Sequence, residues 1–327
     1  MLNDLLKVPH FIRIGASATT LVSLSLSLKE RLLRMAVGWF YLSFYALCFL
    51  GLMCIILTIC WMQLWHGGFA WDGTILMFNY HPVLMVVGLV VLYSAASLVY
   101  RLPRSWVGPK LPWKIGHAAL HLLAFILTVL GMVAVFQFHH HSKVAKLYSL
   151  HSWLGIVTVF LFACQWFLGF AVFLLPWASV WLRSLLKPIH LFFGVIILSL
   201  SIASVISGIN EKLFFSLNNA TQPYSSLPSE AIFANSLGML VVIFGLLVLY
   251  ILLVSSWKRP EPGILTEGQA PGSVLLSLVT SSRTPGAWLH LLWQVETRLT
   301  VHHTVTWPAG GTVTGLPEGM ERLKPLG

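Results

Sequence analysis

Charged residues are scarce in this 327-residue chain, where Asp, Glu, Lys and Arg together make up only 9%. A soluble globular domain carries about 25% charged residues, so too few are present here to cover a water-exposed surface of this size. Apolar residues account for 57% of the chain and the mean hydropathy is +0.83, which also excludes an intrinsically disordered protein. The composition therefore indicates an integral membrane protein built from helices.

Cysteine is also rare, and all four residues lie inside apolar runs without any CxxC spacing. This pattern argues against a disulfide framework, an iron–sulfur cluster and a zinc site. The simplest interpretation is that these small apolar side chains pack within helices. The four are Cys48, Cys54, Cys60 and Cys164.

Acidic residues are half as numerous as basic ones, 10 against 20. Apolar runs separate the basic residues, so no continuous basic face for nucleic acid is expected. In a membrane protein such an excess sets the orientation, because cytosolic loops are richer in Lys and Arg than loops on the other side.

Six apolar stretches are each long enough to cross a bilayer, which takes roughly 20 helical residues. The sequence therefore predicts an all-α membrane protein with six transmembrane helices. The expected spans, numbered one to six in chain order, are residues 39–65, 75–100, 112–136, 147–175, 188–209 and 231–254.

The loops between these spans predict the orientation. Eight Lys and Arg residues follow spans two, four and six, against three that follow spans three and five. The positive-inside rule therefore places both termini in the cytosol. The single glycosylation sequon, at Asn219, then falls in a lumenal loop. Around a six-helix core at 35–258, we expect an N-terminal cytosolic extension at 1–34 and a cytosolic, disordered tail at 259–327.

Histidine is frequent, with 13 residues, and five of them fall within the expected spans. Ionisable side chains inside a membrane are costly, so each is a candidate functional residue, although a single one is as often an ordinary core residue. Spans two to five each carry one histidine near the N-terminal end. Because neighbouring helices run in opposite directions, these four fall at two depths. His81 pairs with His151 towards the lumen, and His117 with His190 towards the cytosol.

Two histidines at one depth on different helices suit an axially ligated haem, whose iron takes a neutral imidazole on each face. Such a macrocycle needs small neighbours, and Gly155 and Gly194 each follow a histidine by four residues on the same helix face. Gly88, seven residues after the histidine of span two, is expected on that face too. Spans two to five then form a four-helix dihaem core. His121, one turn after the histidine of span three, is a possible partner of a haem propionate.

Two other classes of protein share parts of this pattern. A haem-free metal or proton transporter also uses histidines inside the membrane, but it would string them along one path. A dihaem subunit of a respiratory complex would place two ligands on each of two helices, whereas here four helices carry one each. The pairing at two depths favours the haem interpretation.

Four local motifs accompany the paired histidines. They are residues 78–85 (FNYHPVLM), 97–101 (SLVYR), 148–153 (YSLHSW) and 187–190 (KPIH). Through these motifs the chain resembles the cytochrome b561 family over roughly residues 40–258. The resemblance implies two b haems that pass electrons from cytosolic ascorbate to a lumenal acceptor. Its nearest branch is lysosomal and ascorbate-dependent, and there the acceptor is ferric iron.

The resemblance also implies a cytosolic site for ascorbate, which is a monoanion at neutral pH and should bind to basic residues. The family's cytosolic contacts match Lys110, Lys114 and Arg183, with Arg101 as a further candidate. The alternative for any one of them is an ordinary residue that sets orientation.

On the lumenal side, the family's substrate histidine matches His139, and Asn79 and Tyr148 are expected to line the same mouth. Imidazole suits transition metals, which agrees with a ferric acceptor. A solvated, pH-responsive loop is the alternative for this histidine cluster. The resemblance further implies a homodimer in the late endosomal or lysosomal membrane. The residues alone do not distinguish Fe³⁺ from monodehydroascorbate as the electron acceptor.

Overall fold

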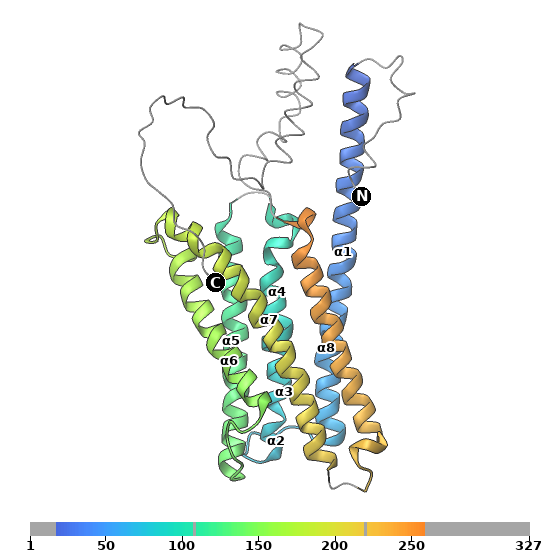
Figure 1. The fold of residues 1–327 in the computed structure, drawn as a ribbon, viewed down its shortest axis with the longest axis vertical. Coiled ribbons are helices and arrows are strands. Elements are labelled where there is room, and N and C mark those ends of the chain that lie inside the picture. Colours follow the sequence, from blue (N-terminus) through green and yellow to red (C-terminus); the bar gives the residue numbers. More distant parts are fainter. Residues whose placement is uncertain (1–17, 107–108, 219–220, 259–327) are drawn as a thin grey trace, which may run out of the picture. The chain divides into compact units, whose positions relative to one another are not determined.

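The computed structural model describes residues 18–106, 109–218 and 221–258. Within them the chain forms six long apolar helical spans and no strand (Figure 1). This confirms the expected all-α fold with six transmembrane helices. Residues 1–17, the sequon at Asn219 and the expected tail at 259–327 lie outside the described residues.

The first span is the C-terminal part of a longer helix, α1 (Ala18–Trp65). The part that is long and apolar enough to cross a membrane is Arg34–Trp65. Residues 18–34 contain no Gly or Pro, so nothing in them ends a helix before the span begins. The described part of the expected N-terminal extension therefore continues the first span as one helix.

The second span contains a π-helical turn. Thr74 caps its start, because the Thr74 side chain accepts a hydrogen bond from the N–H of Leu76. Two hydrogen bonds from Thr74 to the Asp72 carboxylate lower the pKa of Asp72. The span runs through α2 (Ile75–Phe78), α3 (Tyr80–Met85), the π-helical η2 (Val86–Leu92), α4 (Tyr93–Leu98) and η3 (Val99–Arg101).

The third span, α5 (Leu111–His141), is longer than the sequence predicts. It continues past the expected end, so the histidines that end it lie on its last turn. The fourth span is α6 (Leu150–Gly169), extended by the π-helical η5 (Phe170–Leu174), and the sixth is α8 (Ser229–Leu253).

The fifth span, α7 (Val180–Leu217), begins earlier than expected. The side chain of Ser179 accepts a hydrogen bond from the N–H of Leu182, which caps the helix there, and Pro188 lies inside it. The expectation that this proline starts the helix is therefore wrong. His190 lies about three turns into α7 and not near its first residue.

The second span is more deeply buried than the other five. It packs along α5 and also contacts α1, α7 and α8. Its buried Gly88, Ser94 and Ala96 are small, which allows neighbouring helices to approach closely. Elsewhere α6 packs against α7 and α1 against α8, and Figure 1 shows α1 and α8 side by side. The spans that carry the paired histidines are thus neighbours.

Candidate functional site

Two histidines face each other at one end of these spans, His81 from α3 and His151 from α6. Their ring centroids lie 6.1 Å apart. His81 Nδ1 lies 3.1 Å from the carbonyl oxygen of Gly131, and His151 Nδ1 lies 2.9 Å from that of Ser204. Because a carbonyl only accepts, each Nδ1 carries the proton, and Nε2 is left free to bind a metal.

The other two histidines face each other towards the opposite end, His117 from α5 and His190 from α7. Their ring centroids lie 6.3 Å apart. His117 Nδ1 lies 2.8 Å from the carbonyl oxygen of Ala96, and the ring of Phe173 lies 5.1 Å from that of His190. The structure therefore brings together the same two pairs that the alternating helix direction predicts. Their role as ligands stays a prediction.

Two glycines lie directly against ligand-candidate rings. A Cβ on Gly208 would come within 2.7 Å of His151 Cε1, and a Cβ on Gly169 within 2.9 Å of His190 Cε1. Gly169 follows His151 by 18 residues on α6, and Gly208 follows His190 by the same interval on α7. This spacing is about five helical turns. Each helix thus presents a histidine and a glycine on one face, and each glycine receives the histidine of the neighbouring helix.

The sequence predicts two other glycines, Gly155 and Gly194, beside the macrocycle, and that placement stays a prediction. A Cβ on Gly155 would meet only the hydroxyl of Ser204, at 3.5 Å, and one on Gly194 would meet Gln165 at 3.8 Å. These are ordinary contacts. Gly169 and Gly208 could have been found from the repeated 18-residue spacing, but only once the helix boundaries and the α6–α7 contact were known.

Two basic side chains meet at the end of η5, near the His117 and His190 pair. Lys114 Nζ donates a hydrogen bond to the carbonyl of Phe173, at 3.0 Å. Arg183 donates from Nε to the carbonyl of Val172 at 3.2 Å, and from Nη2 to that of Leu175 at 3.0 Å. The C-terminal carbonyls of this segment therefore draw cations from α5 and α7 to one place.

Of the other two predicted basic residues, Lys110 lies near Lys114, as Arg183 does, and Arg101 does not. Lys110 is exposed at the N-cap of α5, and it is close enough to repel Lys114 electrostatically. Arg101 instead donates hydrogen bonds to the carbonyls of Leu252 and Val254 at the end of α8, the latter at 3.0 Å. The structure thus groups three of the four predicted cytosolic residues and places the fourth against another helix.

At the His81 end, His139 and Tyr148 lie near Glu211 of α7. The Tyr148 hydroxyl donates a hydrogen bond to the Glu211 carboxylate at 3.3 Å, and Glu211 also acts electrostatically on His139. Desolvation and the adjacent carboxylate raise the pKa of Tyr148. These two predicted residues are therefore brought together around one acidic side chain.

Asn79 lies at the same end but is fully buried. Its Nδ2 donates hydrogen bonds to the carbonyls of His66 and Gly68, at 2.9 Å and 2.6 Å. Its Oδ1 has no hydrogen-bond partner among the described residues. Asn79 thus fixes the loop that precedes span two, and it does not line an open mouth as expected.

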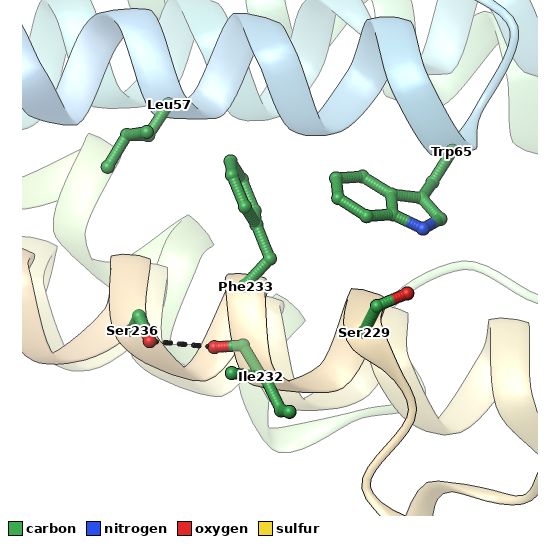
Figure 2. A pocket seen from close by; sticks show the side chains of 6 residues that line it. All are labelled: Leu57, Trp65, Ser229, Ile232, Phe233 and Ser236. Atoms are coloured by element: carbon green, nitrogen blue, oxygen red, sulfur yellow. Dashed lines mark hydrogen bonds between the residues drawn. The ribbon is translucent and has the colours of Figure 1, made fainter.

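An apolar groove of about 500 Å³ lies between α1 and α8 (Figure 2). Trp65 and Phe233 face each other there, with ring centroids 5.0 Å apart. The Ser236 hydroxyl donates to the carbonyl of Ile232. The lining includes no histidine and no charged side chain, so the groove is separate from the candidate site.

Comparison with known proteins now decides the family. The chain matches the family described as Eukaryotic cytochrome b561 over residues 80–216, which include all four paired histidines. The lysosomal membrane ascorbate-dependent ferrireductase of Bos taurus is 79% identical over 233 residues, which are 71% of this chain and 88% of that protein. The chain belongs to the cytochrome b561 family.

Two further relatives extend the comparison. The lysosomal membrane ascorbate-dependent ferrireductase of Homo sapiens is 78% identical over 235 residues, which are 72% of this chain and 97% of that protein. The plasma membrane ascorbate-dependent reductase of Xenopus laevis is 45% identical over 212 residues, which are 65% of this chain and 74% of that protein.

Cytochrome b561 proteins bind haem, and the residues present in this chain fit that group. With metal–nitrogen bonds of about 2 Å, two imidazoles on opposite sides of one ion have ring centroids about 6 Å apart. The two pairs are separated by 6.1 Å and 6.3 Å. Three of the four rings have Nδ1 at a backbone carbonyl, the outer contact that commonly orients a metal-binding histidine.

His121 lies one turn deeper in the membrane than the histidine that precedes it on α5. It is buried, and its ring centroid lies 4.6 Å from that of His117 and 4.7 Å from that of Tyr93. Its Nδ1 has no hydrogen-bond partner among the described residues. The surroundings of His121 are thus mainly aromatic, and its expected role as a propionate partner stays a prediction.

Proposed function

We propose that this chain is an ascorbate-dependent ferrireductase of the lysosomal membrane, which passes electrons from cytosolic ascorbate to lumenal Fe³⁺. The observation that carries the proposal is the presence of two facing imidazole pairs at two depths of the same four spans. Relatives at 78–79% identity whose names state this activity support it.

In the proposed arrangement, His81 and His151 hold one haem b and His117 and His190 hold another. When bound, each haem supplies a one-electron carrier. The chain's own contribution is to fix the imidazoles. Backbone carbonyls hold three of the four rings in the tautomer in which Nε2 is free, and the apolar helices around both pairs exclude water.

Ascorbate is proposed to bind at the cationic cluster formed by Lys110, Lys114 and Arg183. Among the described residues, no carboxylate forms an ion pair with the cluster. Its positive charge is therefore available to attract a monoanion. The cluster lies next to the proposed cytosolic haem, since Lys114 is bonded to the carbonyl of Phe173 and the Phe173 ring touches His190.

Substitution of Lys114 by Met is expected to raise the KM for ascorbate by about tenfold. The variant removes one of the three positive charges that attract the ascorbate anion. Steady-state reduction with varied ascorbate measures this. Arg104→Met, which changes an exposed basic residue between spans two and three, is the matched control and should leave KM unchanged. Equal KM values for the two variants would contradict the proposed ascorbate site.

Substitution of Arg101 by Gln is expected to act on stability. Its guanidinium holds two carbonyls at the end of α8, so the change should lower the free energy of unfolding by about 1–3 kcal/mol. Thermal unfolding in detergent measures this, and the KM for ascorbate should stay within about twofold of wild type. A raised KM with unchanged stability would instead place Arg101 in the ascorbate site.

The lumenal acceptor site is proposed at His139 and Tyr148. Imidazole and phenol oxygen both suit a ferric ion. His121 is proposed to contact a haem propionate. These roles follow the family resemblance, and the grouping of His139 and Tyr148 around Glu211 supports the acceptor site.

The proposed orientation places both termini in the cytosol, because the loops at that end hold more Lys and Arg. The chain is further proposed to form a homodimer, to act in late endosomes as well as lysosomes, and to be glycosylated at Asn219. Its proposed parts are an N-terminal extension at 1–34, the core at 35–258 and a cytosolic tail at 259–327.

The test of the function is an absorption spectrum of the purified full-length chain before and after addition of ascorbate. A haem Soret band that shifts on reduction, followed by reoxidation with ferric citrate, is expected. Absence of the band, or a band that ascorbate leaves oxidised, would overturn the proposal. Reoxidation by monodehydroascorbate but not by ferric citrate would mean that monodehydroascorbate is the electron acceptor, while the proposed route through two haems would stand.

A further inference from the structure

Lys212 is a charged residue of α7 that the proposed electron path does not use. It follows Gly208 by four residues and Ser204 by eight, so the three positions share one face of the helix. Ser204 accepts the Nδ1–H of His151 through its carbonyl, and a Cβ on Gly208 would touch the same ring. Lys212 therefore lies on the face of α7 that contacts His151, one turn nearer the lumen.

The side chain of Lys212 reaches across to the second span. Its Nζ lies 4.7 Å from the centroid of the Phe78 ring, and that ring lies 6.0 Å from the ring of His81. The ammonium is thus situated between α7 and α2, beside the His81 and His151 pair. The aromatic face attracts the cation but offers no negative charge to neutralise it.

No carboxylate within the described residues lies at ion-pair distance from the Lys212 ammonium. Glu230 is already engaged, because its Oε1 accepts a hydrogen bond from Trp61 Nε1 at 3.0 Å and lies 3.0 Å from His66 Nε2. Glu211, the preceding residue, is bonded to a tyrosine hydroxyl. Lys212 is therefore a partly buried cation whose acidic neighbours bind other groups.

One further charge acts on Lys212, because the Glu230 carboxylate attracts it from beyond ion-pair distance while it is bound to Trp61 and lies beside His66. Burial and the positive charge of Lys212 lower the pKa of His66 to about 3, so that imidazole stays neutral at acidic pH as well. A partly buried ammonium without an anion at ion-pair distance is unfavourable. The imbalance indicates that an anion from outside the polypeptide completes the site.

We propose that Lys212 binds a carboxylate group beside the His81 and His151 pair, at the lumenal end of the proposed electron path. The inference rests on the proposed function, since it places this carboxylate next to a haem. Two sources share the required chemistry. One is a propionate of the haem held by that pair, and the other is an organic acid that chelates the ferric substrate. The experiment separates them.

Lys212→Met removes the charge and keeps the length of the side chain, Lys212→Arg keeps the charge, and Lys143→Met removes an exposed lysine at the same end as a control. The full-length haem protein is purified for each. The midpoint potentials of both haems are measured by redox titration. The KM is measured for ferric citrate and for hexaammineruthenium(III), a cationic acceptor without a carboxylate.

If Lys212 binds a propionate, Lys212→Met lowers one midpoint potential, because the ferrous haem loses a stabilising positive charge. A tenfold change in that one-electron equilibrium is about 59 mV. If Lys212 binds the chelator, the potentials stay constant and the KM for ferric citrate rises about tenfold, while the ruthenium acceptor is unaffected. In both cases Lys212→Arg resembles wild type.

Wild-type values in Lys212→Met for both potentials and for the ferric citrate KM would overturn the inference. An equal shift in Lys143→Met would overturn it as well, because the effect would then be one of general surface charge. If the proposed function is wrong, the result differs, because the wild-type chain itself would then contain no haem that ascorbate reduces.

Discussion

Replacement of His117 by Ala is expected to remove about half of the bound haem and to abolish fast reduction by ascorbate. His117 and His190 face each other with ring centroids 6.3 Å apart, and alanine removes one of the two imidazoles that would hold this haem. This pair lies beside the cationic cluster around Lys114, so the electron is expected to enter here. A chain that lacks this haem has no acceptor next to ascorbate.

The mirror variant His81→Ala is expected to lose the other haem and to give a different phenotype. Ascorbate should still reduce the remaining haem quickly, but electrons should no longer reach ferric citrate. The haem-to-protein ratio and stopped-flow reduction distinguish the two variants. His140→Ala, an exposed histidine at the end of α5, is the control and should keep both haems. Full haem content in both pair variants would show that these histidines are not the ligands.

Gly208→Ala is expected to weaken haem retention at the His81 and His151 pair by roughly tenfold or more, since overpacking of a filled interior costs typically about 1–3 kcal/mol. The added Cβ would lie 2.7 Å from Cε1 and 2.9 Å from Nδ1 of His151. That ring is held in place by the carbonyl of Ser204, so it cannot move away without losing a hydrogen bond. The loss should therefore fall on one haem.

Gly169→Ala is the mirror of this change, because its Cβ would lie 2.9 Å from Cε1 of His190. This variant should weaken retention of the haem at the His117 and His190 pair. Gly155→Ala and Gly194→Ala are comparison variants on the same two helices, since their added methyl groups would touch neither imidazole. Haem dissociation to apomyoglobin measures retention in all four variants. Equal retention in the four would mean that the close approach of these glycines has no role in holding haem.

The six spans and their alternating direction could be predicted from the sequence, because burial in lipid demands long apolar runs with every backbone group bonded within the helix. Alternation alone then assigns His81 and His151 to one depth and His117 and His190 to the other. The structure contains both pairs. This part of the site depends only on where a residue lies along its helix.

The neighbour that each residue meets across its helix was less predictable. Gly88 was expected on the face of His81, and both residues face α5: His81 Nδ1 lies 3.1 Å from the carbonyl oxygen of Gly131, and a Cβ on Gly88 would meet that of Ala124 at 2.9 Å. The residue count did not show what lies opposite Gly88, which is the backbone of the neighbouring helix.

The partners of Arg101 and Asn79 likewise depend on elements that are distant in sequence. Arg101 lies in the loop that the charge pattern assigns to the cytosol, yet its guanidinium is used by the carbonyls of Val254 and Leu252 on α8. Asn79 is fully buried because the loop at His66 and Gly68 folds over it. No local pattern contains either contact.

The sequence by itself determined the membrane class, the six spans and the depth of each histidine, since hydrophobicity and length along one helix decide all three. Only the tertiary structure decided which glycines receive the imidazoles, which carbonyls orient them and which cations gather at η5. The physical reason is that these contacts form between helices. They depend on rotation and packing, which the order of residues along a single helix does not contain.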